Sequence, residues 1–187
     1  MHYTLPWLLQ QAYQAQRIKY LFFWGHKPSS NGSLTATCLS QWWVGHPFSE
    51  HEEVFLTAEH YMMAGKARLF GDEEMYRAIL ASASPGEAKD LGRKVRNFDQ
   101  RVWEAHRLSI VAEGSYLKFS QHEDLKAFLL SSQDRVLVEA SPRDRIWGIG
   151  LGKDNPDAEH PDRWRGKNLL GFCLMEARDR IQREIEG

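Results

Sequence analysis

Residues 57–70 read TAEHYMMAGKARLF, and this stretch predicts the helix around which the rest of the chain is organised. Thr57 is typical of a helix N-cap, and Glu59 falls in the first turn, where the helix dipole favours a carboxylate. Lys66 follows Glu59 about two helical turns later on the same face. A solvated surface pair is one interpretation. The apolar and aromatic neighbours of Glu59 favour another, a carboxylate with a chemical task.

Working outward from this helix, the pattern predicts an α+β fold: a compact, mainly helical single domain with a few short strands. Short strands are expected at residues 18–24, 39–44, 54–56 and 136–140. Further helices are expected at residues 72–81, from 85 to between 95 and 98, at 99–119, at 124–131 and from 168 to 185. Residues 1–17 are expected to form an N-terminal helical extension and residues 18–187 the main domain.

Composition sets the class of protein. A length of 187 residues suits one domain with one core, and a net charge of −1 gives no general attraction to nucleic acid. Cys38 and Cys173 are the only cysteines and show no zinc-ligand spacing, which favours a reduced protein. No apolar run approaches the roughly 20 residues of a membrane span. We therefore expect a soluble, cytoplasmic protein with no membrane partner, or a nuclear one if the source is eukaryotic.

Residues 141–148, SPRDRIWG, place Asp144 in a turn between a predicted strand and a glycine-rich loop. A local salt-bridged turn explains this pattern. The alternative puts Asp144 at the lip of a cleft, with Trp147 stacking on a base or a ribose and Gly148 allowing close approach of the backbone. The sequence leaves both interpretations open.

Two basic segments are candidate phosphate sites. Lys167 and Asn168 stand at the start of the last predicted helix, where free N–H groups attract anions, although a cap without a ligand is equally consistent. Arg93 belongs to a basic cluster near a helix end, where the helix dipole favours cations without any ligand.

Other motifs are incomplete. Residues 51–55, HEEVF, lack the second histidine of a zinc-protease signature, and residues 148–152, GIGLG, do not have the spacing of a dinucleotide fingerprint. The histidines do not cluster, and neither a nucleophile elbow nor a phosphate-binding P-loop is present. The sequence therefore predicts no metal and no cofactor.

The order of several short motifs resembles the NADAR (YbiA-like) superfamily over about residues 18–183. The matching stretches are residues 22–26 (FFWGH), 40–43 (SQWW), 57–67 (TAEHYMMAGKA), 91–95 (LGRKV), 103 (W), 118–119 (KF), 138–144 (VEASPRD), 147–150 (WGIG) and 164–171 (WRGKNLLG). Family members often have an aromatic residue and a proline before the threonine, where this chain has Phe55-Leu56. That departure affects the entry into the helix and leaves Glu59 in place.

The resemblance implies an N-glycosidase, a hydrolase of N-glycosyl compounds that works without metal or redox cofactor. Two substrate groups are implied: ADP-ribose attached to guanine bases, including ADP-ribosylated DNA, and phosphoribosylamino-pyrimidine intermediates of riboflavin synthesis. It places the key glutamate at Glu59 and its partner positions at Trp103 and Asp144. The residues expected to contact the ligand are Trp24, Gly25, His26, Lys66, Arg93, Trp147, Gly148, Lys167 and Asn168.

Two alternatives share these features. A non-catalytic module would bind ADP-ribose or NAD in the same pocket without releasing a base. A structural or partner-binding domain would bind no small ligand. Turnover separates the first alternative from an enzyme, and stabilisation by a ligand separates the second from both.

Overall fold

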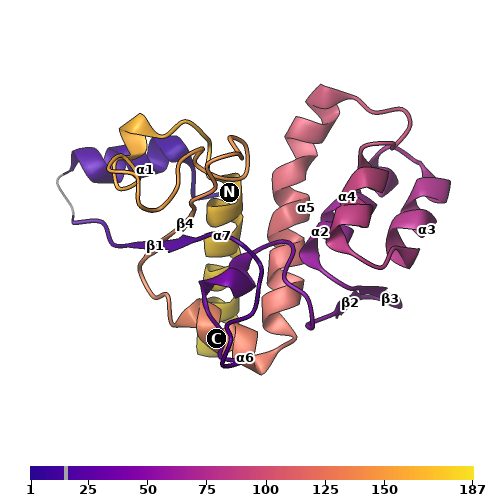
Figure 1. Ribbon diagram of the computed structural model, residues 1–187, viewed down its shortest axis with the longest axis horizontal. Helices are drawn as coiled ribbons and strands as arrows, with labels where there is room; N and C mark the ends of the chain where they lie inside the picture. The colour runs from indigo at the N-terminus through magenta and orange to yellow at the C-terminus, as the bar shows by residue number, and fades with distance from the viewer. Residues whose placement is uncertain (15–16) are drawn as a thin grey trace.

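The computed structural model describes residues 1–14 and 17–187 and confirms the mainly helical α+β prediction (Figure 1). The elements in chain order are α1 (Leu5–Tyr13), β1 (Tyr20–Phe23), the 3₁₀ helix η1 (Ala36–Leu39), β2 (Phe48–Glu50), β3 (Glu53–Phe55), α2 (Ala58–Leu69), α3 (Glu73–Ala81), α4 (Pro85–Gly92), α5 (Gln100–Ser120), α6 (Glu123–Leu130), β4 (Val136–Glu139), the 3₁₀ helix η2 (Pro161–Arg163) and α7 (Leu169–Glu186). Helix α1 forms within the segment expected to be an N-terminal helical extension, of which residues 15–16 lie outside the described residues. Among the described helices, none is both long enough and apolar enough to cross a membrane.

Helix α5 lies between α2 and α7 and joins the two sides of the molecule (Figure 1). Glycines set its distance from α2. A Cβ atom at Gly114 would lie 2.5 Å from Cδ1 of Tyr61, and one at Gly65 would lie 2.7 Å from Cγ2 of Ile110. Because real side chains do not tolerate such distances, these positions need glycine for the two helices to pack this closely.

Strands β1 and β4 form a parallel pair, with Tyr20 opposite Val136 and Phe23 opposite Glu139. Helix α7 packs against β4, and the side chain of Asn168 fixes the contact: its Nδ2 donates to the carbonyl of Leu137 at 2.9 Å, and its Oδ1 accepts from the N–H of Glu139 at 3.0 Å. The last residue of β4 is therefore held by the start of α7.

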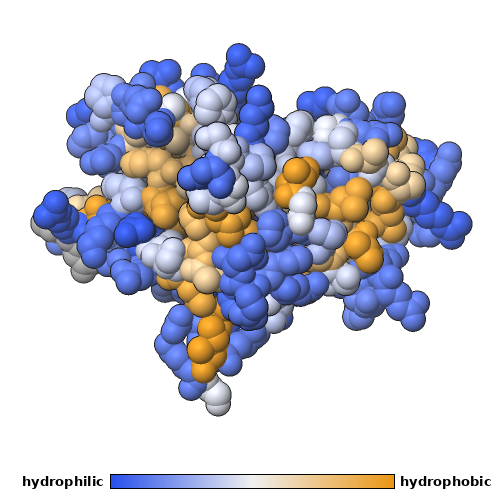
Figure 2. Space-filling view, turned by 60° about the horizontal axis from the view of Figure 1, so that its bottom comes forward, coloured by the Kyte–Doolittle hydropathy of each residue, from blue (hydrophilic) through white to orange (hydrophobic). Residues whose placement is uncertain are grey.

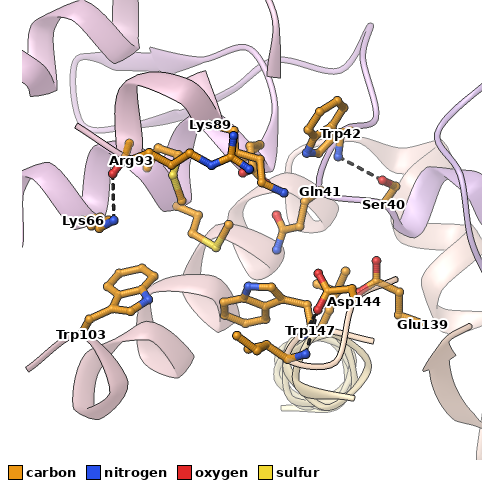
Figure 3. Close-up of a pocket in the computed structure, with 16 residues that line it drawn as sticks. Ser40, Gln41, Trp42, Lys66, Lys89, Arg93, Trp103, Glu139, Asp144 and Trp147 are labelled. Atoms are coloured by element: carbon orange, nitrogen blue, oxygen red, sulfur yellow. Dashed lines mark hydrogen bonds between the residues drawn. The ribbon is translucent and has the colours of Figure 1, made fainter. Parts of the chain in front are cut away.

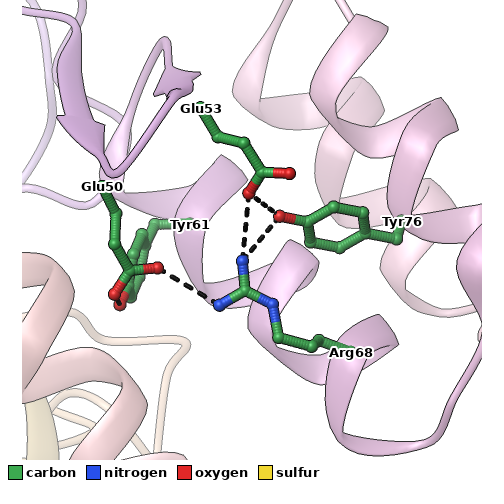
Figure 4. Close-up of polar contacts among 5 residues, drawn as sticks. All are labelled: Glu50, Glu53, Tyr61, Arg68 and Tyr76. Carbon is green, nitrogen blue, oxygen red and sulfur yellow. Dashed lines mark hydrogen bonds and ion pairs between the residues drawn. The ribbon is translucent and has the colours of Figure 1, made fainter.

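The β2–β3 hairpin is tied to α2 by a network of polar contacts around Arg68 (Figure 4). The guanidinium of Arg68 pairs with Glu50 at 3.2 Å and with Glu53 at 3.0 Å. The hydroxyl of Tyr61 donates to Glu50 at 2.8 Å, and that of Tyr76 donates to Glu53. These contacts fix the chain just before the N-cap of α2.

Two predicted elements are wrong. Residues 39–44 are not a strand but the end of η1 followed by turns, because the buried ammonium of Lys118 takes hydrogen bonds to the carbonyls of Cys38 (2.6 Å) and Ser40 (2.9 Å) that a sheet would need. Helix α4 ends at Gly92 and not between 95 and 98. There, the carboxylate of Asp72 accepts from the N–H of Arg96 at 2.8 Å and draws the chain off the helix axis.

The surface carries hydrophobic side chains in separate patches. On the face shown in Figure 2, these patches lie between hydrophilic side chains and do not merge into one apolar surface. Among the described residues, both cysteines are buried free thiols. Patches of this kind are ordinary for a folded domain and do not by themselves indicate a partner.

Candidate active site

A cavity of about 390 Å³ opens between α2, α4, the start of α5 and the loop after β4 (Figure 3). Its lining residues are Ser40, Gln41, Trp42, Glu59, Met62, Met63, Lys66, Lys89, Gly92, Arg93, Trp103, Glu139, Asp144, Ile146, Trp147 and Leu170. They come from segments that are far apart in the sequence and meet only in the folded chain.

Three carboxyl groups meet at this cavity: Glu59 from the first turn of α2, Glu139 from the end of β4, and Asp144 from the following loop. Glu59 is only 3% exposed, and its N–H donates to the carbonyl of Gln41 at 3.0 Å. Figure 3 shows Glu139 and Asp144 side by side. Such a group of buried carboxyl groups is expensive to assemble, which is typical of a functional site.

Several polar atoms of the cavity have no hydrogen-bond partner within the described part of the chain. They are Oε1 of Glu59, Oε2 of Glu139 and both amide atoms of Gln41, and all four are buried. Because buried polar groups are nearly always paired in folded proteins, these atoms indicate a ligand that carries hydrogen-bonding groups of its own.

The carboxylate of Asp144 is held by the loop that follows it. Its Oδ1 accepts from the N–H groups of Ile146 at 2.8 Å, Trp147 at 2.7 Å and Gly148 at 3.5 Å. Gly148 acts through its backbone, because a Cβ there would lie 2.8 Å from the carbonyl oxygen of Glu139. Asp144 therefore has a fixed orientation at the edge of the cavity.

Burial raises the pKa of Glu59 to about 7, and repulsion by Asp144 adds to the effect, while Lys89, Trp42 and Arg93 oppose it. Burial also raises the pKa of Glu139 to about 8, and the charges of Asp144 and Glu59 raise it further against the attraction of Lys89. Like charges this close do not all ionise, so the group retains a proton at neutral pH.

The other side of the cavity is aromatic and cationic. Figure 3 shows Lys66 and Arg93 across the cavity from Glu139 and Asp144. The ammonium of Lys66 donates to the carbonyl of Gly92 at 2.8 Å and lies 5.9 Å from the ring centre of Trp103, and burial lowers its pKa. The site thus has an acidic end and a basic end with indole rings between them.

The structure brings together half of the residues that the sequence singled out. Glu59, Lys66, Arg93, Trp103, Asp144 and Trp147 all line the cavity. Gly25, Gly148, Lys167 and Asn168 do not line it, nor do Trp24 and His26. Trp24 is 60% exposed and lines a separate groove of about 420 Å³, whereas the ring of His26 lies 5.5 Å from that of Trp42 and supports the cavity wall from behind.

The anion site predicted at the start of α7 is wrong, because its amides already have acceptors. The N–H groups of residues 167–170 donate to the carbonyls of residues 145–148 at 3.1 to 3.3 Å. Asn168 is the N-cap by position, but its side chain is bound to β4 and does not cap the helix. Lys167 is exposed. These residues position the loop of Asp144, and do not open toward a ligand.

Sequence reasoning missed Glu139, Gln41, Trp42 and Lys89 as lining residues. The signal for Glu139 was present: it is the one charged residue that closes the apolar run VLVEA, at the carboxyl end of a strand. Gln41 and Trp42 lie in a segment expected to be a strand, and that expectation hid their position in a turn.

Comparison with known proteins places the chain in a family. The NADAR domain model matches residues 22–182. The chain is 41% identical over 172 residues to N-glycosidase R617 of Acanthamoeba polyphaga mimivirus, covering 88% of this chain and 97% of that protein. It is 31% identical over 135 residues to N-glycosidase YbiA of Escherichia coli (strain K12), covering 72% and 76%. The NMR structure of E. coli YbiA matches with a TM-score of 0.67 and 28% identity over 92% of this chain and 94% of that chain. The chain therefore belongs to the NADAR domain family.

Proposed function

We propose that this chain is an N-glycosidase that hydrolyses the bond between ribose C1 and a base nitrogen. The observation that carries the proposal is Glu59, a buried glutamate whose Oε1 lacks a protein partner, at a cavity walled by indole rings. Two relatives that bear the name N-glycosidase support it.

The chemistry follows from the arrangement of charge. Cleavage of a ribose C1–N bond builds positive charge at C1, and a carboxylate beside that carbon stabilises it and aligns the attacking water. We assign these tasks to Glu59. Asp144, fixed by three backbone N–H groups, orients the ribose hydroxyls. Trp103 and Trp147 stack on the base or sugar.

The substrate class follows from the opposite end of the cavity. Lys66 and Arg93 lie across from the carboxyl groups, as a phosphate attached to the ribose requires (Figure 3). Two substrates combine ribose, base and phosphate in this way: ADP-ribose on a guanine base, either free or in DNA, and a phosphoribosylamino-pyrimidine. We propose that one of these is hydrolysed.

Base release from both substrates, followed by chromatography, tests the proposal. Glu59→Gln is expected to lower kcat by roughly 100-fold or more, since it removes the charge that faces the cation. Glu52→Gln, in the exposed β2–β3 turn, is the matched control and should retain wild-type activity. Full activity in folded Glu59→Gln would remove Glu59 from the centre. A melting temperature raised by ADP-ribose without any turnover would instead favour a binding module.

A further inference from the structure

We propose that Glu139 is the proton donor to the departing base, so that the reaction uses two glutamates with opposite tasks. This inference rests on the proposed N-glycosidase function and adds a catalytic residue to it. It begins from the position of Glu139 at the carboxyl end of β4, inside the same cavity as Glu59.

The backbone of Glu139 is held on both sides. Its N–H donates to Oδ1 of Asn168 at 3.0 Å, and its carbonyl accepts from the N–H of Ile149 at 3.0 Å. The side chain has no such restraint at its end, because Oε2 is buried and has no partner within the described part of the chain. A rigidly mounted carboxyl group with a free oxygen facing a cavity is the geometry of a general acid.

Three charged groups from three different elements face Glu139: Glu59 of α2, Asp144 of the following loop, and Lys89 of α4. Two of them are negative, and together with burial they favour the protonated form, which raises the pKa of Glu139 to about 8. The pKa of Glu59 is raised less, to about 7. Between these values Glu59 gives up its proton first and Glu139 keeps its own. The acid and the base of the reaction are thereby assigned.

Asp144 fits the role of donor less well. Its Oδ1 already accepts backbone N–H groups, from Ile146 and Trp147 at 2.8 and 2.7 Å, so this oxygen is occupied and its orientation is set by the loop. A carboxyl group that hands over a proton needs an oxygen free to reach the leaving group. Glu139 has one.

The step balances as follows. The C1–N bond breaks and its electron pair stays on the departing nitrogen, which receives the proton of Glu139. A water oxygen bonds to C1 and loses a proton to the carboxylate of Glu59. The products are a ribose with a hydroxyl at C1 and a base with an N–H. Transfer of the proton from Glu59 to Glu139 restores the enzyme.

The first test is the pH profile of kcat/KM for wild type and Glu139→Gln, measured by base release. Wild type should show a bell with limbs near about 7 and about 8, which report Glu59 and Glu139. Glu139→Gln should lower kcat by roughly 100-fold or more with little change in KM, and it should lose the alkaline limb. Glu52→Gln should match wild type. An unchanged alkaline limb in Glu139→Gln, or retained kcat, overturns the assignment.

A second measurement does not depend on turnover. Infrared difference spectra of the wild type should contain the C=O stretch of a protonated carboxylic acid at neutral pH, lost on titration through about 8 and absent in Glu139→Gln. If wild type releases no base from either substrate but this band is present, the proposed function fails and the protonated Glu139 stands, without its catalytic role. If the band is absent at neutral pH, Glu139 carries no proton to donate and the inference fails.

Discussion

Replacing Glu59 by glutamine should make the folded protein more stable above neutral pH, although it should abolish activity. The unfolded chain ionises this carboxyl group at its ordinary pKa of 4.5, whereas the folded chain holds the proton up to about 7. As the pH rises between these values, the folded state keeps a proton that the unfolded state has lost, so the contribution of Glu59 to stability falls. Above about 7 the full cost of a buried charge is present, and a neutral amide removes it.

The magnitude follows from the raised pKa. One pKa unit corresponds to about 1.4 kcal/mol, so a rise from 4.5 to about 7 corresponds to about 3 kcal/mol at alkaline pH. Glu59 is 3% exposed, so solvent screening reduces this little. For a chain of this size, about 3 kcal/mol raises Tm by roughly 6 to 12 °C. Coupling to Glu139 makes these upper values, because loss of one charge also eases the ionisation of the other.

Urea unfolding of wild type, Glu59→Gln and the control Glu52→Gln at about pH 5 and about pH 8.5 measures the effect on both sides of the titration. Glu59→Gln should gain stability over wild type mainly at the higher pH, and Glu52→Gln at neither. A gain of the same size at both pH values would mean that packing, and not ionisation, is responsible. A loss at both would refute the reasoning that Glu59 is a strained group.

Two further predictions concern the walls of the site. Lys118→Met removes the donor to the carbonyls of Cys38 and Ser40 and should cost roughly 2 to 3 kcal/mol in urea unfolding at pH 7; a change below about 0.5 kcal/mol would show that the turn holds without it. Trp103→Ala should raise KM for either substrate about tenfold or more, because an indole wall is lost, whereas Trp24→Ala, outside the cavity, should leave KM within about twofold. Equal effects of the two tryptophan variants on KM would place the ligand in both grooves.

The local signals of the chain were sufficient for most helices. Thr57 caps α2 as its side-chain chemistry predicts, and Ser84 with Pro85 starts α4. The ends were harder. Helix α4 stops at Gly92 because Asp72, from the turn before α3, binds Arg96. No local pattern contains that long-range contact.

The candidate site was predictable where one segment carries both a charge and its setting. Glu59 and Lys66 share a helix face, and Asp144 precedes Trp147 in one loop, so sequence placed all four in a cleft. Glu139 needed more. Its role depends on the parallel pairing of β1 with β4 across most of the chain, a contact that hydrophobic alternation does not specify. The strand was expected, but not the partner that turns its last residue toward the cavity.

The site combines rigid backbones with unpaired side-chain ends. Glu59 is held through its N–H by the carbonyl of Gln41, and Glu139 through its N–H by Asn168. The Gln41 segment is in turn fixed by the buried ammonium of Lys118. Each carboxyl group is therefore positioned by hydrogen bonds to its own main chain or to a neighbouring main chain, and its unpaired oxygen is left for the ligand. A site stabilised through the carboxyl oxygens themselves would be more stable, but it would have nothing left with which to bind water or a departing base.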